Sequence, residues 1–264
     1  EETEWLHLDN FFLHPAGKPP QENCGHATIV SMPLSSADQA AIAAENLFKG
    51  LSEAELALVY DITRIRLVNA DEFIYHQGDP SAHVYFLLEG RVKLGQVTTD
   101  GQQVLLRILG PRSLFAIVAL TSNTPYPIRA QTAEPSRLAY WSKEDLKALV
   151  LRIPLLAINS MDIMSAYVQE YQDRFRELAT ERVERRLART LLRLASQSGQ
   201  KKPEGILIDI PLTRQSLAEM IGATLFTVSR ILSQWESQQI VQSGRERITI
   251  RAPHQLVLIA DDAS

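Results

Sequence analysis

The sequence predicts an α+β chain with an N-terminal antiparallel β-sandwich, one long helix and a C-terminal winged helix-turn-helix. Three observations lead to this fold class. Short β-like runs recur at even spacing between residues 65 and 141, a long amphipathic stretch follows from Pro154 to about Ala179, and two short amphipathic patterns flank Gly222. Evenly spaced short strands are typical of sandwiches and barrels, and two short helices followed by a hairpin are typical of a winged helix.

Composition limits the class of protein. The 264 residues suggest two domains, and a hydrophobic fraction of 45% is ample for packed cores. Cys24 is the only cysteine, which excludes a disulfide framework and a cysteine-rich zinc or iron–sulfur site within one chain. No apolar run approaches the length of a membrane span, and the first residues lack the pattern of a secretion signal. We therefore expect no membrane partner and a cytoplasmic location.

Residues 1–45 are predicted to be a loosely ordered extension. Four prolines lie between Pro15 and Pro33, and every charged residue except Lys18 is acidic. The extension also contains a group of apolar residues that suits docking on the body of the protein or on a partner subunit: Trp5, Leu6, Leu8, Phe11, Phe12 and Leu13.

Residues 46–153 are predicted to contain the β-sandwich. A helical pattern over 46–62 carries a capping box in which Ser52 is the N-cap and Glu55 the third helical residue, and a second helix is expected over 143–151. Asp100-Gly101 is a strong hairpin turn. The predicted strands, each bounded by Gly, Asp, Asn or Pro, are Ile65–Val68, Glu72–His76, Val84–Leu88, Arg91–Val97, Gln103–Leu109, Ile128–Thr132 and Arg137–Trp141.

Residues 154–180 are predicted to form a dimerisation helix. The near-heptad spacing of its apolar residues suits a helix that packs against its symmetry mate in a homodimer. A helix that packs only on its own domain is the alternative. One stripe consists of Ile158, Met161, Ser165, Val168, Gln172, Phe175 and Ala179, and it is flanked by Leu155, Met164, Tyr171 and Leu178.

Residues 181–264 are predicted to form the winged helix-turn-helix. A helix over Glu181–Ser196, a linker over 198–203 and a strand over Ile206–Ile210 precede the two short helices. Gly222 suits the turn between these helices, and Thr213 and Thr224 stand at the expected N-cap positions. An ordinary αα-hairpin is the alternative. The alternating stretch from Ile240 to Arg251 argues against it, because this pattern predicts a β-hairpin wing around Ser243-Gly244.

The charge of this region favours DNA as a partner. The whole chain has a net charge of −4, whereas Pro211–Arg251 contains five arginines and three glutamates, a net charge of +2. Thr227, Ser229 and Arg230 lie on the polar face of the second helix, and such side chains bind phosphates and base edges. The pattern therefore predicts a helix that enters the major groove.

From Leu47 to Ile259 the chain resembles the family of the cyclic-AMP receptor protein and the fumarate-nitrate reductase regulator, the CRP/FNR family. The resemblance implies a double-stranded β-helix sensor domain like that of cyclic-nucleotide-binding proteins. It also implies a homodimeric transcription regulator that binds a palindromic operator in double-stranded DNA, with RNA polymerase as a further partner if it is an activator. The segments that carry the resemblance are Ile74–Asp79, Val84–Leu94, Glu181–Ala188, Leu212–Gln215 and Thr227–Leu232.

The chain departs from the family pattern where a cyclic nucleotide would bind. Cyclic-nucleotide-binding members have a Gly-Glu pair and then an Arg-Ser pair that grips the cyclic phosphate. Here the first region reads Leu114–Val118 and the second reads Asn123–Pro127, without a cation or an acid in either. We therefore expect an effector other than cyclic AMP. The single Cys24 also argues against the iron–sulfur cluster of the oxygen-sensing members.

A further departure lies in the second helix. Family members often have a glutamate just before the Thr-x-Ser/Gly-Arg sequence, where it accepts a hydrogen bond from cytosine. Phe226 stands there, and its ring can contact a thymine methyl group but cannot accept that bond. This predicts an altered operator, unless Phe226 packs against protein.

The predicted DNA-binding residues have different roles. Arg230 is expected to read a guanine, and Ser229 and Phe226 to tune the neighbouring bases. Gly244 and Arg245 are expected to place the wing on the backbone. The remaining residues are expected to hold phosphates: Thr213, Arg214, Gln215, Thr224 and Thr227.

Three other interpretations stay open. The first is a haem-dependent gas or redox sensor, with axial ligands drawn from His76, His83, Cys24 and His26. The second is a small-molecule sensor that acts through protein contacts. The third is a cupin-like metalloenzyme, which the scattered histidines and the lack of catalytic arrangements disfavour, so that we expect no enzyme activity.

Overall fold

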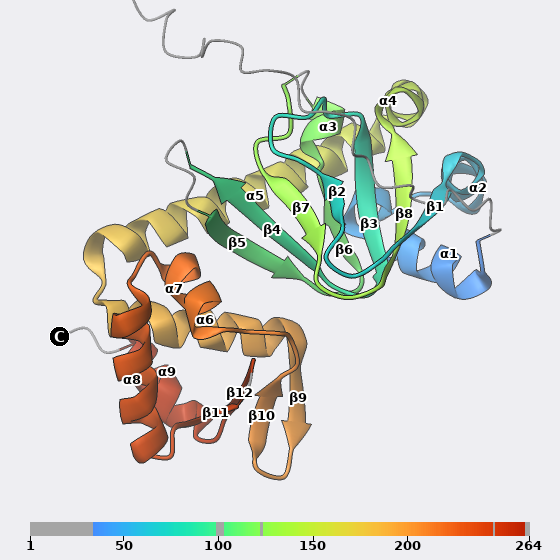
Figure 1. Cartoon of the computed structure of the whole chain (residues 1–264). Coiled ribbons are helices and arrows are strands. Elements are labelled where there is room, and N and C mark those ends of the chain that lie inside the picture. The colour runs from blue at the N-terminus through green and yellow to red at the C-terminus, as the bar shows by residue number, and fades with distance from the viewer. Residues whose placement is uncertain (1–33, 99–102, 122–123, 245, 262–264) are drawn as a thin grey trace, which may run out of the picture.

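The computed structural model describes residues 34–98, 103–121, 124–244 and 246–261. They form an N-terminal β-sandwich with flanking helices and a C-terminal α/β unit, joined by one long helix (Figure 1). No single helix in these ranges is long and apolar enough to cross a bilayer. Helices α4 (Lys143–Arg152) and α5 (Leu155–Thr180) reach that threshold only as a pair, and they are bent by 118° relative to each other.

Two antiparallel four-stranded sheets make up the sandwich, in the orders β1-β8-β3-β6 and β2-β7-β4-β5, which confirms the predicted fold class. Trp141 is fully buried in the core between the sheets and the N-terminal helices, where its indole nitrogen donates to Thr63 Oγ1 at 2.9 Å. The sequence did not predict β6. The strands are β1 (Arg64–Val68), β2 (Phe73–Tyr75), β3 (His83–Glu89), β4 (Val92–Val97), β5 (Gln103–Leu109), β6 (Ser113–Phe115), β7 (Arg129–Thr132) and β8 (Ser136–Ser142), with α3 (Val118–Thr121) after β6.

The N-terminal extension is partly structured, contrary to the prediction for residues 1–45. Residues 1–33 lie outside the described part of the chain, but Ser36–Ala43 forms helix α1, which begins with a capping box of Ser35 and Asp38. Ile42 of this helix is fully buried in the sandwich core. Asp38 also accepts two hydrogen bonds from Arg137 of β8, at 2.7 and 2.9 Å, so α1 is anchored by packing and by charge.

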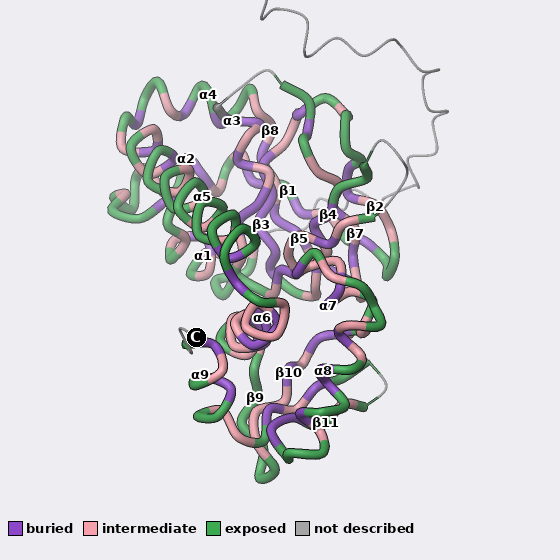
Figure 2. The backbone as a smooth tube through the Cα atoms, turned by 90° about the vertical axis from the view of Figure 1, so that its left-hand side faces the viewer, coloured by how far each residue is buried: buried purple, intermediate pink, exposed green. Residues whose placement is uncertain are grey.

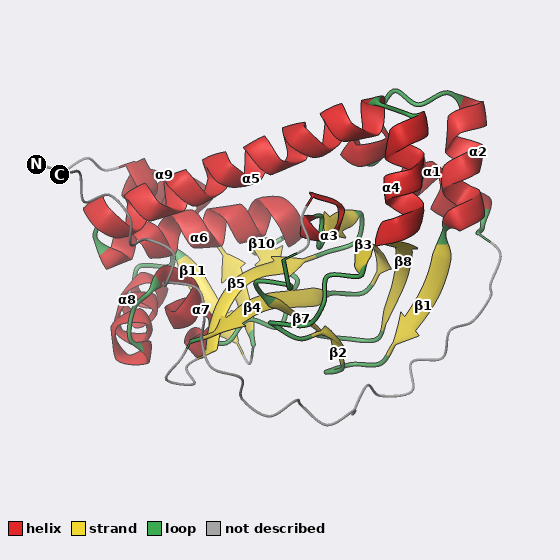
Figure 3. Ribbon diagram, turned by 90° about the horizontal axis from the view of Figure 1, so that it is seen from above, coloured by secondary structure: helices red, strands yellow, loops and turns green. Residues whose placement is uncertain are grey.

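Two short helical elements link α1 to the sandwich. The 3₁₀ helix η1 (Asn46–Phe48) buries Leu47 and Phe48. Helix α2 (Glu53–Ile62) starts with the predicted capping box, in which Ser52 Oγ accepts from the Glu55 backbone N–H and the Glu55 carboxylate accepts from the Ser52 N–H. After the sandwich, α4 packs on its edge and α5 extends to the C-terminal unit (Figure 3).

The C-terminal unit has the predicted helix-turn-helix and wing. The hairpin turn lies after Gly244 and not at Ser243-Gly244, because both of these residues pair with β12. Its sheet has the order β11-β12-β10-β9, and its core contains the fully buried Trp235. The linker expected over 198–203 is instead largely strand β9, because it pairs with β10 as a hairpin. The last helix, α9, was not predicted. The elements are α6 (Val183–Ser198), β9 (Gly199–Lys202), β10 (Gly205–Ile208), α7 (Arg214–Ile221), α8 (Leu225–Ser237), β11 (Val241–Gly244), β12 (Arg247–Ile250) and α9 (Pro253–Asp261).

Strand β5 belongs to both units. Its register with β4 shifts between Leu94, which pairs with Arg107, and Gly95, which pairs with Leu105, so Leu106 is an extra residue. This bulge reverses the alternation of side chains along β5. Leu109 therefore packs in the sandwich core, while Leu105 and Ile108 pack in the core of the C-terminal unit, beside α7 (Figure 1).

Polar contacts also join the sandwich to the C-terminal unit and hold strand β5 in place. Arg91 of the sandwich lies 3.2 Å from the carboxylate of Asp209, which follows β10. Arg174 of α5 donates to the carbonyl oxygen of Leu106, at 2.8 Å, and so holds the bulge.

Candidate nucleic-acid interface and effector cavity

The turn between α7 and α8 has the geometry that the sequence predicts. Gly222 has φ 61° and ψ 49°, in the left-handed region that favours glycine. Thr213 Oγ1 accepts a hydrogen bond from the Ser216 N–H at 2.9 Å, and Thr224 Oγ1 accepts one from the Thr227 N–H at 3.1 Å. Both threonines are therefore N-caps, which fix where α7 and α8 begin.

Helix α8 has one buried and one exposed face. Val228, Leu232 and Trp235 are fully buried, and the Trp235 indole nitrogen donates to Glu184 of α6 at 3.0 Å. On the other face Arg230 is exposed, and 77% of the Phe226 side chain is accessible. Phe226 therefore does not pack against protein within this chain. The orientation of α8 is set by its core, and its outward face is left for a partner.

Several other predicted DNA-binding residues lie on α7 and β11, the elements that pack against α8. Arg214 at the start of α7 lies 3.7 Å from Glu236 near the end of α8, and Glu236 also accepts from the Ser243 backbone N–H at 3.0 Å. This carboxylate thus joins α7, α8 and the wing strand β11. Gly244 is exposed at the end of that strand, whereas Arg245 lies outside the described residues.

Some of these polar groups already have partners in the free protein. The hydroxyls of Thr224 and Thr227 lie 2.9 Å apart, and the Gln215 amide donates to Glu219 at 3.0 Å. Ser229 is half-buried. Arg230 has no ion-pair partner within the described ranges.

Arg247 lies beside these residues, although the sequence did not predict it as a DNA-binding residue. It is exposed on β12 of the wing, opposite Gly244 in the β11–β12 pairing. Its place in a predicted basic hairpin was the signal that could have included it.

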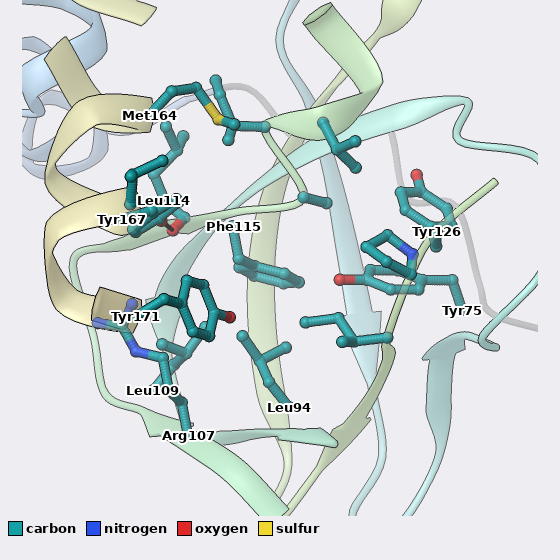
Figure 4. A pocket seen from close by; sticks show the side chains of 16 residues that line it. Tyr75, Leu94, Arg107, Leu109, Leu114, Phe115, Tyr126, Met164, Tyr167 and Tyr171 are labelled. Carbon is teal, nitrogen blue, oxygen red and sulfur yellow. Dashed lines mark hydrogen bonds between the residues drawn. The ribbon is translucent and has the colours of Figure 1, made fainter. Parts of the chain in front are cut away.

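The second site is a cavity of about 240 Å³ between the sandwich and α5 (Figure 4). The family resemblance pointed to two segments of its wall, but the sequence did not predict the rest of the lining, which comes from strands and a helix that are far apart along the chain. The two segments that depart from the family pattern contribute much of the wall: Leu114, Phe115, Ala116, Ile117, Val118, Tyr126 and Pro127. At this site the departures replace phosphate-binding groups by apolar side chains.

Arg107 is the charged residue of the cavity wall, and it shares the carboxylate of Glu170 with a second arginine. Its guanidinium lies 3.2 Å from Glu170 of α5 and 5.6 Å from the centre of the Tyr167 ring. Glu170 also pairs with Arg174 at 2.8 Å. Burial lowers the pKa of Arg174, and the Glu170 carboxylate counters that shift. These contacts hold Arg107 at the α5 side of the cavity (Figure 4).

The histidines proposed as haem ligands lie elsewhere. His76 is exposed, with its backbone N–H bonded to Asp79, and His83 stands edge-on to the Tyr140 ring at 5.3 Å. Burial lowers the pKa of His83. Neither lines the cavity, and Cys24 and His26 lie outside the described residues. Within the described ranges there is also no group of three or more His, Cys, Asp or Glu side chains suited to a metal ion.

The outer face of α5 carries an apolar stripe. Its exposed residues follow a 3-4 pattern, with Met161, Val168 and Phe175 seven residues apart, Tyr171 between Val168 and Phe175, and Leu178 three residues after Phe175. Phe175 is 75% exposed and Met161 69%. Figure 2 shows the long exposed face of this helix.

Comparisons with known proteins identify the fold and the family. Residues 65–152 match the model of the cyclic nucleotide-binding domain, and residues 185–259 match that of the Crp-like helix-turn-helix domain. The chain belongs to the CRP/FNR family of transcription regulators. The two matched ranges together span more than half of this regulator, and they contain the cavity-lining strands and the DNA-binding helices.

Relatives of this regulator have different functions. It is 28% identical over 209 residues to the global nitrogen regulator of Synechococcus elongatus, covering 78% of this chain and 92% of that one. It is equally 28% identical over 205 residues to the cyclic AMP receptor protein of Thermus thermophilus, with the same coverage. FixK2 from Bradyrhizobium japonicum, at 22% identity, shares the fold with a TM-score of 0.67, covering 77% of this chain and all of FixK2.

Proposed function

We propose that this regulator is a homodimer that binds a palindromic operator through α8 and responds to an effector other than cyclic AMP. The observation that carries the proposal is the outward face of α8. Phe226 and Arg230 project from a helix whose start is capped by Thr224 and whose other face is anchored in the core. A helix presented in this way enters the major groove in helix-turn-helix proteins.

Each candidate residue has a role in this interface. Arg230 reads a guanine with its two-pronged guanidinium, and Ser229 and Phe226 tune the adjacent bases. The wing contributes Gly244 and Arg245, with Arg247 beside them on β12. Phosphates are bound by Thr213, Arg214, Gln215, Thr224 and Thr227, with Arg214 shared between the DNA and Glu236.

The palindrome follows from the proposed dimer. The stripe of Met161, Val168, Tyr171, Phe175 and Leu178 repeats at coiled-coil spacing and is uncovered in the single chain. Two chains that pair along it are related by a two-fold axis, and two recognition helices related in this way require a two-fold symmetric operator.

The effector is proposed to bind in the cavity between the sandwich and α5. A cyclic nucleotide suits this cavity poorly. Its phosphate would be buried, and Arg107, the cation of the wall, is already paired with Glu170. The cavity touches Val168 and Tyr171 of the α5 stripe and Arg107 and Leu109 of β5. Since β5 also packs in the C-terminal core, an effector can bias the position of α8 through either element.

The test is a DNA-binding titration on an operator selected from random duplexes, repeated with variants at each base pair and at several salt concentrations. Arg230→Ala should remove the preference at one base pair in each half-site, which corresponds to about 1–3 kcal/mol of discrimination. Arg214→Ala should weaken all sequences alike and lower the salt slope by about one phosphate. Arg152→Ala on α4 makes the same charge change far from the interface and serves as the control.

Two outcomes would overturn parts of this proposal. If Arg230→Ala weakens every sequence equally and keeps the base preference, α8 is not the reading helix. A Soret band in the freshly purified protein would favour the haem sensor over the small-molecule effector.

A further inference from the structure

The hydroxyl of Tyr75 lies at the cavity wall and has no protein partner among the described residues. Tyr75 is 5% exposed, and its oxygen points into the cavity (Figure 4). No hydrogen bond joins it to another residue in the ranges that the structure describes. A hydroxyl that faces a cavity in this way can donate a hydrogen bond to a molecule that enters it.

The position of this hydroxyl is held by the neighbouring aromatic rings. The Tyr126 ring stacks on Tyr75 at 3.9 Å, and Tyr85 stacks nearby at 5.8 Å. Tyr126 is itself locked, since its hydroxyl donates to the carbonyl oxygen of His83 at 2.7 Å and accepts from the His83 N–H at 2.9 Å. Burial raises the pKa of Tyr75, so it stays a neutral donor at physiological pH. The chain therefore presents a fixed O–H at the cavity wall.

The remainder of the wall limits the charge and size of a ligand. Apolar and aromatic side chains dominate it, and Arg107 is already paired with Glu170. A cationic ligand would have no acid in the wall to pair with, and an anionic one would have to compete with Glu170 for Arg107 and lose its hydration. A cavity of about 150 Å³ holds benzene, and sites for larger drug-like molecules start near 300 Å³. The volume of about 240 Å³ lies between these limits.

We propose that the cavity binds an uncharged aromatic molecule of one or two rings that accepts a hydrogen bond from Tyr75. The ring packs against Phe115 and the α5 side chains, and the acceptor faces the Tyr75 hydroxyl. The identification of this cavity as the effector site rests on the proposed function, but binding itself does not depend on DNA.

The test uses three probes of similar shape: methyl benzoate, which is neutral and has an acceptor, benzoate, which is charged, and ethylbenzene, which has no acceptor. Binding of each to the full chain is measured by calorimetry at pH 7. We expect methyl benzoate to bind at least tenfold tighter than benzoate. Tyr75→Phe should weaken methyl benzoate about three- to tenfold, the value of one neutral hydrogen bond, and leave ethylbenzene unchanged.

Tyr60→Phe is the matched control. It removes a hydroxyl that bonds to Gln39 outside the cavity, and it should leave binding of all three probes unchanged. The proposal is overturned if benzoate binds as tightly as methyl benzoate, if Tyr75→Phe weakens ethylbenzene as much as methyl benzoate, or if no probe binds up to its solubility limit. If the Tyr75 variant does not fold, the affinities of the three probes for the unmodified chain still test the proposed ligand class.

These outcomes are separate from those of the proposed function. A chain that binds its operator but no probe refutes only the ligand class. A chain that binds methyl benzoate with no change in operator affinity supports the ligand class and refutes the effector role of the cavity.

Discussion

At the scale of single residues, Phe226 offers the most specific prediction about DNA recognition. Its ring is exposed, and we expect it to stand where other members of the family have a glutamate that accepts a hydrogen bond from cytosine. We expect Phe226→Ala to lose a thymine preference at one position of each half-site, because the contact with the methyl group disappears. Phe226→Glu should shift the preference at that position toward cytosine.

The measurement is the selection of operators from a random pool by each variant. Leu225→Ala, a change at the neighbouring exposed residue, is the control. Unchanged preferences in both Phe226 variants would show that this side chain does not reach the bases.

Asp38 provides a prediction about stability and pH. The hydrogen bonds from Arg137 hold its pKa below the ordinary 3.8, against the opposing effect of burial. Asp38→Asn should lower the free energy of unfolding at pH 7 by about 3 kcal/mol, because it leaves the guanidinium without its buried partner. Since the folded-state pKa is lowered, this stabilisation exists above the unfolded pKa and is lost as the pH falls through the folded value.

Urea denaturation at pH 7 and pH 3 measures both effects. Glu89→Gln removes the other, more exposed partner of Arg137 and should cost less than about 1 kcal/mol. If the difference between Asp38→Asn and the parent does not shrink as the pH falls from 7 to 3, the assignment to this ion pair is wrong.

At the scale of elements, the prediction concerns α5. Replacing Met161 and Phe175 by Glu places charges in the apolar stripe without touching the effector cavity. We expect the double variant to sediment as a monomer and to lose operator affinity. A monomer contacts only one half-site and therefore binds DNA more weakly than a dimer that contacts both.

The control puts the same two charges at exposed positions of α5 outside the stripe, with Ala166→Glu and Gln169→Glu. This variant should remain a dimer. If the Met161 and Phe175 variant also sediments as a dimer, the subunits associate through another surface.

At the scale of the whole molecule, the prediction concerns coupling between the two units. Leu105 belongs to the sandwich in sequence but is buried in the C-terminal core. Leu105→Ala should destabilise the contact by about 2–5 kcal/mol, the usual cost of truncating a buried leucine. Val97→Ala, at an exposed position of β4, serves as the control.

Hydrogen exchange followed by mass spectrometry distinguishes the two units. We expect faster exchange in α7 and α8 of the Leu105 variant and little change in β3 and β8. The substitution removes a contact of the C-terminal core, whereas the central strands of the sandwich do not pack on Leu105. Uniform acceleration along the chain would mean that the two units unfold as one.

The sequence alone determined the features that depend on neighbouring residues. The turn at Gly222, the N-caps Thr213 and Thr224, the capping box at Ser52 and the helical span of α5 are local, and each was predicted and is present. The family resemblance added the sandwich topology and the kind of ligand that the chain should not bind. The site roles of individual residues stay predictions until DNA binding is measured.

Only the tertiary structure decided which distant residues meet. The periodicity of apolar residues predicts which face of an element is buried, but it does not predict the element on which that face packs. The anchoring of α1 through Asp38 and Arg137 was therefore not predictable. The bulge at Leu106 reverses the side chains of β5, so simple alternation could not assign Leu105 to the C-terminal core. The cavity and the free hydroxyl of Tyr75 likewise arise from segments brought together by packing. The physical reason is that backbone conformation is set largely by adjacent residues, whereas burial partners are set by the packing of the whole chain.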